Sequence, residues 1–314
     1  MVNLVLNENM KIYRRVRTWI LVGLMVAFVL FVNIIEWHSG GKKAQGEGWR
    51  TELHQENQQW SKVLKQRELN KEERTYYEQR IALNDYHLKQ DIRSTDGTMW
   101  DGVYGSANLM IVITIFTIII VGDSVASEFS SGTIKLLLIR PASRIKVLAS
   151  KYISVMLFGM LLLLTLFIVS FVGNGILYGF GYMDLPLINM TADGQIVERN
   201  MVLNLWKTYM LNGVSTVMYV TLAFMISSAF RSSAMAIGFS VGALFAGNLV
   251  MQALQRFDWS KYLLFANTDL AQYLNGHPFQ EGMTLSFSIG VLVVYFFVFN
   301  LISWLIFTRR DVAA

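Results

Sequence analysis

The chain has 314 residues, of which 54% are hydrophobic and only 16% are charged. Soluble domains carry about 25% charged residues, so this composition excludes an ordinary soluble enzyme and a disordered protein. The absence of cysteine excludes a disulfide scaffold, a thiolate metal site and a cysteine nucleophile. The four histidines do not stand at metal-ligand spacing, and the formal net charge is +5. We therefore expect a membrane protein that binds no metal.

The first 17 residues combine basic and apolar side chains. Leu6, Met10 and Tyr13 recur at the spacing of one helix face, and basic residues occupy much of the remaining surface. This pattern predicts an amphipathic helix over 1–17, an elbow that lies in the cytoplasmic membrane interface before the first span. A frayed basic tail is the alternative. The apolar stretch that follows, 18–35, is too long for the core of a cleaved signal peptide, so we expect an uncleaved anchor.

Six apolar segments are long enough to cross a bilayer. Its hydrocarbon core is about 30 Å thick and needs roughly 20 apolar residues in a helix. One such segment fits a buried helix of a soluble protein, but six in one chain of this length do not. The sequence therefore predicts an all-α integral membrane protein with six transmembrane helices. The predicted spans are 18–35, 107–126, 152–178, 207–230, 234–254 and 284–307.

Basic residues gather on one side of these spans. With the N-terminus in the cytoplasm, the short cytoplasmic segments hold far more Lys and Arg than the short outer loops. Short loops rich in Lys and Arg stay inside, so both ends of the chain, including the tail 308–314, are expected to be cytoplasmic. The basic excess is explained by this asymmetry, and we expect no nucleic-acid partner.

The outer segment between spans one and two is large enough for a small domain. Within 38–104, the stretch from Trp49 to Asp91 is rich in Glu, Gln, Lys, Arg and Leu, which favour helix. We expect an extracytoplasmic helical hairpin, which either meets a substrate or partner or caps the mouth of the pore. The outer loop before span four shows only turn signals, at Asp184 and Asp193.

The last outer segment, 255–283, contains short apolar pieces separated by polar residues. They are too short to cross a bilayer. Non-helical backbone at membrane depth is tolerated where it is buried against protein. The segment therefore predicts short re-entrant helices between spans five and six.

Ionisable side chains are absent from predicted spans three, five and six. Such groups are the usual mark of ion coupling, so the sequence argues against an ion-coupled transporter, and also against an intramembrane hydrolase. We expect the polar residues at depth, Asn33, Asn174 and Asn248, to bond to neighbouring helices. Gly238 and Gly242 form a small-residue pattern in span five that fits either a subunit interface or packing within one subunit.

The cytoplasmic connector 127–151 is the most informative stretch. Its apolar run 134–139 is too short to span and too apolar for a solvated loop, so it needs a covering surface. The chain has no Gly-x-x-x-x-Gly-Lys-Ser/Thr phosphate loop, so an ATPase that drives transport would be a separate polypeptide. Other features are a Gly-Thr turn before the run, a proline after it and a serine suited to cap the next helix. These residues are Gly132, Thr133, Pro141 and Ser143.

This connector resembles that of the membrane subunits of type-2 ABC exporters. The resemblance lies in the pattern Glu-x-x-x-Gly-Thr, an apolar run, Pro-x-Ser-Arg and a lysine before the next span. It covers nearly the whole chain, because that family has an interfacial helix before the first of six spans and short re-entrant helices before the last. In the family this segment forms a coupling helix that docks on a cytoplasmic ATPase. The resemblance implies that the ATPase-coupling positions are Glu128, Gly132, Thr133, Pro141, Ser143 and Arg144.

The resemblance also implies a function. The chain is expected to be a permease and not an enzyme, paired with a second permease, the same or related, and with a dimer of ATPase subunits that hold ATP and Mg. It would lie in a bacterial plasma membrane and bind no cofactor itself. The outer hairpin departs from compact polysaccharide exporters and looks more like the branch that removes antimicrobial peptides, bacitracin-like antibiotics or other amphiphiles. The alternative is a membrane sensor or scaffold whose hairpin binds a ligand or partner without transport; a passive channel is a third possibility.

Overall fold

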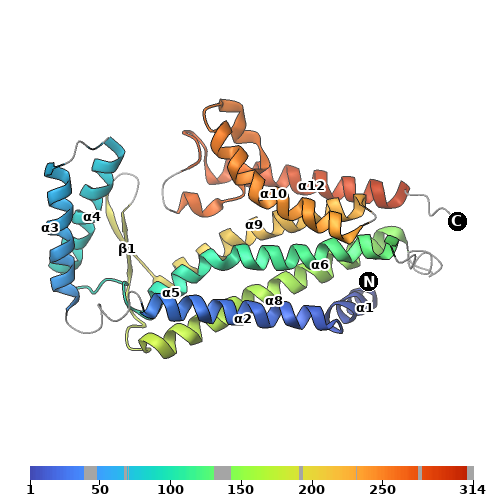
Figure 1. The fold of residues 1–314 in the computed structure, drawn as a ribbon. Helices are drawn as coiled ribbons and strands as arrows, with labels where there is room; N and C mark the ends of the chain where they lie inside the picture. The colour runs from blue at the N-terminus through green and yellow to red at the C-terminus, as the bar shows by residue number, and fades with distance from the viewer. Residues whose placement is uncertain are drawn as a thin grey trace. The chain divides into compact units, whose positions relative to one another are not determined.

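The computed structural model describes residues 1–38, 48–66, 69, 71–130, 143–190, 194–230, 232–274 and 278–309, and at 71, 72, 129 and 248 the backbone alone. This part of the chain is mostly helical (Figure 1). Six of its helices are long and apolar enough to cross a membrane, which confirms the predicted number of candidate spans. They are Val16–Glu36, Met99–Glu128, Arg144–Tyr178, Met201–Ala229, Ser233–Leu254 and Leu285–Arg309.

The chain divides into two compact units. Unit 1 comprises Met1–Ala27, Leu109–Leu166 and Met210–Ala314, and unit 2 comprises Phe28–Asn108 and Phe167–Tyr209. The candidate span Met99–Glu128 divides between the two units, and three further long helices contribute residues to both. These helices are α2 (Val16–Glu36), α8 (Arg144–Tyr178) and α9 (Met201–Ala229).

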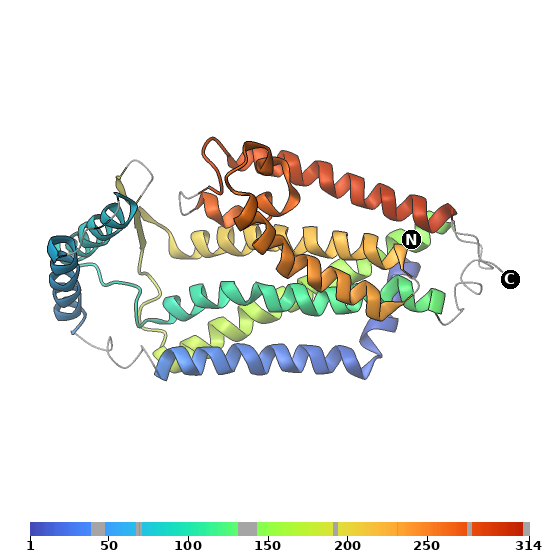
Figure 2. The same ribbon diagram turned by 45° about the horizontal axis from the view of Figure 1, so that its top comes forward.

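Unit 1 begins with α1 (Val2–Tyr13), which turns away from the line of α2 (Figure 2). Its complete long helices are α6 (Met110–Ser130), α10 (Ser233–Leu254) and α12 (Leu285–Arg309). Helices α6 and α10 lie in close contact. A Cβ atom on Gly122 of α6 would lie 2.4 Å from Cγ1 of Ile237, so this contact requires glycine.

The apolar core of unit 1 joins α9, α12 and the short helices that precede α12. Of the short elements η3 (Asp258–Tyr262), α11 (Leu264–Asn267) and η4 (Leu270–Tyr273), the last two contribute residues to this core. Close packing of large aliphatic and aromatic side chains holds these elements together. The buried members of the cluster are Met218, Leu222, Leu264, Leu270, Leu292 and Phe299.

One buried asparagine satisfies the irregular backbone of these short helices. Asn267 Nδ2 donates to the carbonyl oxygens of Lys261 at 2.7 Å and Leu263 at 2.8 Å. Its Oδ1 accepts a hydrogen bond from Ser288 of α12 at 2.6 Å. Buried backbone carbonyls are costly unless they are paired, so Asn267 allows this non-helical segment to be buried against α12.

Unit 2 contains α3 (Trp49–Gln66), α4 (Lys71–Gln90) and α5 (Met99–Ser106). Helices α3 and α4 lie against each other, as both ribbon views show (Figures 1 and 2). Polar side chains bridge them: Asn57 donates to Asp85 at 2.7 Å, and Asn84 donates to Glu56 at 3.1 Å. The predicted helical content of this region is therefore present.

The segment before span four contains a β-hairpin that the sequence analysis missed. Strands β1 (Leu187–Met190) and β2 (Ile196–Arg199) pair antiparallel, with Leu187 opposite Arg199. The hairpin lies beside α4, where Tyr86 donates to Glu198 at 3.1 Å. Turn signals dominated this loop, and two strands of four residues are too short to give a clear alternating pattern. Helix α9 also begins earlier than predicted, at Met201.

Polar residues join the helices inside unit 2. Asn33 of α2 and Ser106 of α5 are hydrogen-bonded at 3.1 Å, as expected for a polar residue at depth. Asn174 of α8 instead donates to Ser170 of its own helix, at 2.9 Å to the carbonyl oxygen. Its Oδ1 faces Gly102 of α5 so closely that a Cβ there would lie 2.0 Å away. The side chain of Asn248 lies outside the described residues.

Candidate functional site

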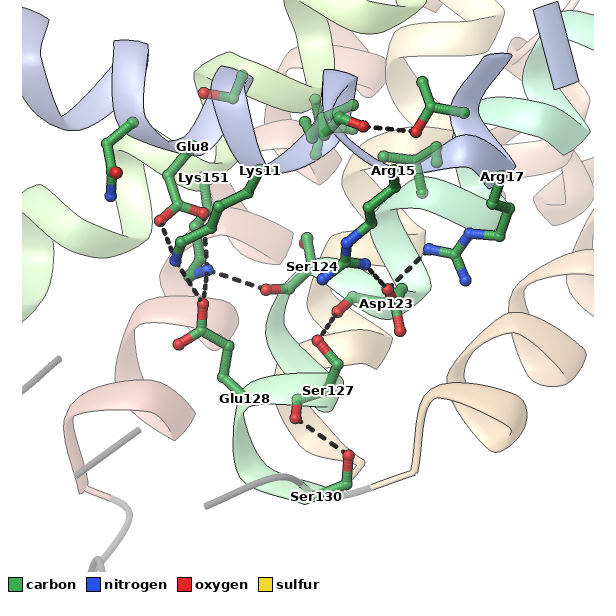
Figure 3. Close-up of a pocket in the computed structure, with 16 residues that line it drawn as sticks. Glu8, Lys11, Arg15, Arg17, Asp123, Ser124, Ser127, Glu128, Ser130 and Lys151 are labelled. Atoms are coloured by element: carbon green, nitrogen blue, oxygen red, sulfur yellow. Dashed lines mark hydrogen bonds and ion pairs between the residues drawn. The ribbon is translucent and has the colours of Figure 1, made fainter. Parts of the chain in front are cut away.

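Two groups of ion pairs lie in unit 1 where α1 and the start of α2 meet the end of α6 and the start of α8 (Figure 3). We call Glu8, Lys11, Glu128 and Lys151 the four-residue charge cluster. Arg15, Arg17 and Asp123 form the Asp123 cluster. Helix α6 ends just before, and α8 begins just after, residues 131–142 of the predicted connector.

Each lysine of the four-residue charge cluster bridges both carboxylates. Lys151 Nζ donates to Glu8 Oε2 at 2.9 Å and to Glu128 Oε1 at 2.6 Å. Lys11 Nζ donates to Glu8 Oε1 at 2.7 Å and to Glu128 Oε1 at 3.0 Å. These bonds connect α1 to both helices that flank the connector. Movement of either helix end therefore strains or breaks contacts to α1.

Three of the four members are buried, so their charges depend on one another, whereas the Lys11 side chain is 39% exposed. The Lys151 side chain is 2% exposed, and the carboxylates of Glu8 and Glu128 are about a tenth exposed. Two positive and two negative charges balance. Removing one member would leave an uncompensated charge, which is the costly event for a buried ion pair.

The pKa values of Glu8 and Lys11 are both shifted by the other charges of the cluster. Burial by itself would raise the pKa of Glu8, but attraction to Lys151 and hydrogen bonds from Lys11 and Lys151 hold that pKa below its ordinary value. Burial would lower the pKa of Lys11, but hydrogen bonds to Glu8 and Glu128 raise it above its ordinary value. Glu8 and Lys11 are therefore both charged at neutral pH.

The turn between α1 and α2 places α1 against the cluster. Carbonyl groups at the end of a helix lack helical partners and must find others. Thr18 Oγ1 donates to the Ile12 carbonyl at 2.6 Å, and Trp19 Nε1 donates to the Tyr13 carbonyl at 2.8 Å. These bonds fix the angle at which α1 leaves α2.

In the Asp123 cluster, two arginines share one carboxylate oxygen. Arg17 Nη2 donates to Asp123 Oδ2 at 2.7 Å, and Arg15 Nη1 donates to the same oxygen. The two arginine side chains are 47% and 42% exposed, whereas Asp123 is mostly buried. Unlike the four-residue charge cluster, this group carries one excess positive charge.

A cavity of about 540 Å³ has both clusters in its lining. Figure 3 shows Ser124 of α6 between the two clusters, with the Asp123 cluster on one side and Glu128 and Lys151 on the other. The second oxygen of Glu128, Oε2, is buried and has no hydrogen-bond partner within the described part of the chain. The residues that line the cavity therefore include partly exposed guanidinium groups and a buried carboxylate whose second oxygen has no donor among the described residues. Across the described ranges, no three His, Cys, Asp or Glu side chains converge as a metal site requires.

The structure places only some of the six predicted coupling positions. Ser143 Oγ accepts a hydrogen bond from the Lys146 backbone at 3.4 Å, as expected of a residue that caps the start of α8. Arg144 Nη1 donates to the Thr308 carbonyl of α12 at 2.8 Å, so this arginine ties two helix ends together. Glu128 lies in the four-residue charge cluster. Gly132, Thr133 and Pro141 lie outside the described residues.

The predicted small-residue pair lies on an open face of α10. Gly238 and Gly242 are exposed, and a Cβ atom on either would have no neighbour within 4 Å. Neither glycine packs closely against another helix in the described part of the chain, so a subunit interface there stays a prediction. Large apolar side chains flank the pair on the same helix and are also exposed. They are Met235, Phe239, Phe245 and Leu249.

Sequence reasoning missed the partners of Glu128. Glu8 is the one acidic residue among the first 17, and Asp123 is the one acidic residue between Ala107 and Ala126. A single acid in a basic or apolar segment is a usable signal, because such a charge needs a partner. The sequence does not show that Glu8 and Lys151, which are far apart along the chain, share one cluster.

Comparison with known proteins gives a family. Residues 78–313 match the family described as "Protein of unknown function (DUF2705)". The chain belongs to this family. It is 43% identical to "Uncharacterized protein YhcI" of Bacillus subtilis (strain 168) over 317 residues, which cover 100% of both chains. It is 33% identical to "Uncharacterized membrane protein YdbK" of the same organism over 208 residues, 65% of this chain and 80% of that one.

The DUF2705 match covers only part of the site. Asp123, Glu128 and Lys151 lie within the matched residues, whereas Glu8 and Lys11 precede them. The similarity to YhcI covers both parts. Together with a relative named as a membrane protein, the six apolar helices indicate a multi-pass membrane protein.

Proposed function

We propose that this member of the DUF2705 family is the permease subunit of a type-2 ABC exporter. It works with a separate cytoplasmic ATPase dimer, which binds ATP and Mg. Together they export an amphiphilic substrate such as an antimicrobial peptide or a bacitracin-like antibiotic. The chain crosses the bacterial plasma membrane six times and has both termini in the cytoplasm. Residues 127–151 dock on the ATPase, and a second permease subunit, the same or related, completes the pore.

The observation that carries the proposal is the four-residue charge cluster. Glu8 on α1 bonds to Lys151 on α8, and both lysines bond to Glu128 on α6. The connector therefore leaves and re-enters a set of helix ends that move together. A docking segment needs helix ends that are joined to one another. If the ends moved independently, a movement of the docked segment would shift only the nearest helix end.

The length of α8 adds to this argument. A helix of 35 residues is about 52 Å long, whereas the hydrocarbon core is about 30 Å thick. Even with tilt, several turns extend beyond the core. Helix α8 thus runs without a break from Arg144, beside the connector, through the membrane, and a shift at the connector reaches the far side directly.

The surface of α1 fits an interfacial elbow. Leu6 and Met10, which belong to its predicted apolar stripe, are exposed, while Glu8 and Ile12 face the protein. In water this arrangement would leave an apolar stripe uncovered. At a membrane interface, lipid covers that stripe. The non-helical backbone before α12 is buried, and Asn267 pairs its carbonyl groups. Such backbone is tolerated at membrane depth, which supports the predicted re-entrant helices.

The test is purification of the full chain from its native membrane in mild detergent. We expect a phosphate-loop ATPase in near-equal amount, and ATP hydrolysis that rises with amphiphilic peptides. Leu137→Asp places a charge in the apolar run of the connector and should remove the ATPase from the preparation. Lys89→Asp on the exposed surface of α4 is the matched control and should retain it.

Two results would contradict the proposal. One is a well-expressed wild-type chain that purifies without any ATPase. The other is an ATPase that remains bound to Leu137→Asp as firmly as to Lys89→Asp. Deletion of α3 and α4 distinguishes the permease from the sensor alternative. A sensor would lose its response to a ligand, whereas a permease would keep its ATPase.

A further inference from the structure

The cavity of about 540 Å³ beside α1 has an unbalanced positive charge in part of its lining. The four-residue charge cluster is neutral, whereas Arg15, Arg17 and Asp123 carry one positive charge in excess. Ligand pockets usually have volumes of about 300–1,000 Å³, so this cavity is large enough to hold a ligand. Docking of the connector on an ATPase does not use this charge. The excess therefore indicates an anionic ligand.

The two arginines have more donors than Asp123 uses. Each guanidinium has five N–H donors, and in the described part of the chain each gives one hydrogen bond, to Asp123 Oδ2. Figure 3 shows that Arg15 and Arg17 reach this oxygen from different sides. Their side chains are 47% and 42% exposed, and both line the cavity. Accessible guanidinium groups are suited to phosphate, because their planar donors match two oxygens at once.

An exposed apolar stripe begins between these two arginines. Val16 separates them in the chain and is 74% exposed, and Ile20 and Leu24 are each 54% exposed. Residues four apart share one face of a helix, so these three side chains form a stripe along the first turns of α2. Because α2 is a candidate membrane span, lipid acyl chains are the natural cover for this stripe. A phosphate source that also has acyl chains would occupy the cationic site and the stripe together.

We infer that Arg15 and Arg17 bind the phosphate of an anionic phospholipid, whose acyl chains lie along the stripe of Val16, Ile20 and Leu24. Basic pockets at the ends of membrane helices bind anionic headgroups in this way. A phosphodiester with a single negative charge, as in phosphatidylglycerol, balances the one excess positive charge. A headgroup that also carries an ammonium has no net charge to offer and brings a cation beside the arginines. This inference uses the membrane location of α2 but not the ATPase, so the two proposals fail independently.

The experiment measures thermal unfolding of the purified full chain in an uncharged detergent during titration with lipid. Short-chain phosphatidylglycerol should raise the melting temperature at concentrations about tenfold lower than phosphatidylcholine with the same chains, since the latter has no net charge. Inorganic phosphate, which has no acyl chains, should have little effect at the same concentrations. Equal half-effect concentrations of the two lipids would overturn the inference. An effect of inorganic phosphate equal to that of phosphatidylglycerol would also overturn it, because it would show a free-phosphate site.

Variants locate the effect at the arginines of the cavity. Arg15→Gln should raise the half-effect concentration of phosphatidylglycerol about tenfold, because a charged donor to the phosphate is lost. Arg14→Gln is the matched control. It removes the same charge from the adjacent residue, which is exposed but does not line the cavity, and it should leave the response unchanged. Asp123→Asn should lower the half-effect concentration, because it removes the acid that competes with the phosphate for both arginines.

A purely structural role of the arginines predicts a different pattern. In that case Arg15→Gln and Asp123→Asn would both lower the melting temperature without lipid, and neither would change the half-effect concentration. That result would overturn the inference. An equal loss of response in Arg14→Gln and Arg15→Gln would overturn it too, because it would show a diffuse attraction of anionic lipid to a basic segment. If Arg15→Gln does not fold, Asp123→Asn decides by the sign of its effect, and the two lipids compared on the natural chain decide without any variant.

Discussion

Ion pairs of the same chemical kind occur in two very different settings in this chain. In the four-residue charge cluster, Lys151 is 2% exposed and bonds to two carboxylates from two other helices. On α4, Arg74 and Glu78 pair at 3.1 Å within one helix, with side chains 65% and 57% exposed. An exposed pair adds little to stability, because each charge gives up water to gain its partner. In a buried cluster, the loss of one charge leaves its partners buried and unpaired, which is costly. The contrast separates charges that maintain solubility from charges that hold helices together.

The largest expected effect is that of Lys151→Met, which leaves Glu8 and Glu128 buried with one lysine between them. Loss of one partner from a buried ion pair costs about 3–5 kcal/mol. Arg74→Met removes one side of the exposed pair and should cost about 0.3–0.5 kcal/mol. Thermal unfolding in detergent measures both. Similar losses of stability in the two variants would contradict the distinction between buried and exposed ion pairs.

The contrast between buried and open positions extends from charge to shape. Gly102→Ala places a methyl group where Asn174 Oδ1 already lies, and overpacking of this kind costs about 1–3 kcal/mol. Gly23 of α2 has no atom within 4 Å of its would-be Cβ, so Gly23→Ala should be neutral or stabilise the helix. The same unfolding assay distinguishes them. A stabilising Gly102→Ala would show that α5 and α8 are packed differently.

A smaller effect should appear as a pH dependence. The pKa of Glu8 lies below its ordinary value, so its contribution to stability is complete above that ordinary value and is lost as the pH falls through the lowered one. The pKa of Lys11 is raised, so its contribution is present below its ordinary value and is lost only as strongly alkaline pH passes through the raised one. Between neutral pH and pH 4, the melting temperature of Glu8→Gln should therefore fall less than that of the wild type. Parallel curves for the two proteins would mean that Glu8 does not ionise within the cluster.

The sequence predicted the elements with a strong periodic or compositional signal. Six long apolar runs, a basic amphipathic start and a helix-rich segment between the first two spans all correspond to helices in the structure. The β-hairpin was missed because its short strands lie among turn residues. The start of α9 was placed too late, because polar residues extend that helix back to Met201.

The candidate site was predicted only in part, for a physical reason. Glu128 and Arg144 were predicted from the resemblance to type-2 ABC exporters, and the connector's need for a covering surface follows from its own composition. The pairing of Glu8 with Lys151 and of Arg17 with Asp123 depends on how distant helices pack. Pairings of that kind leave no spacing signal in one sequence, although each isolated acid indicated that a partner had to exist.

The most direct test of the central claim uses the absence of cysteine from the natural chain. One cysteine is introduced at position 137 in the connector, or at position 89 on α4 as the control, and each protein is treated with a thiol-reactive photo-crosslinker in native membranes. Mass spectrometry identifies the adducts. If the connector docks on an ATPase, position 137 yields an adduct with a phosphate-loop ATPase and position 89 does not. A well-expressed chain that gives no such adduct at position 137, or gives it equally at both positions, would contradict the permease function.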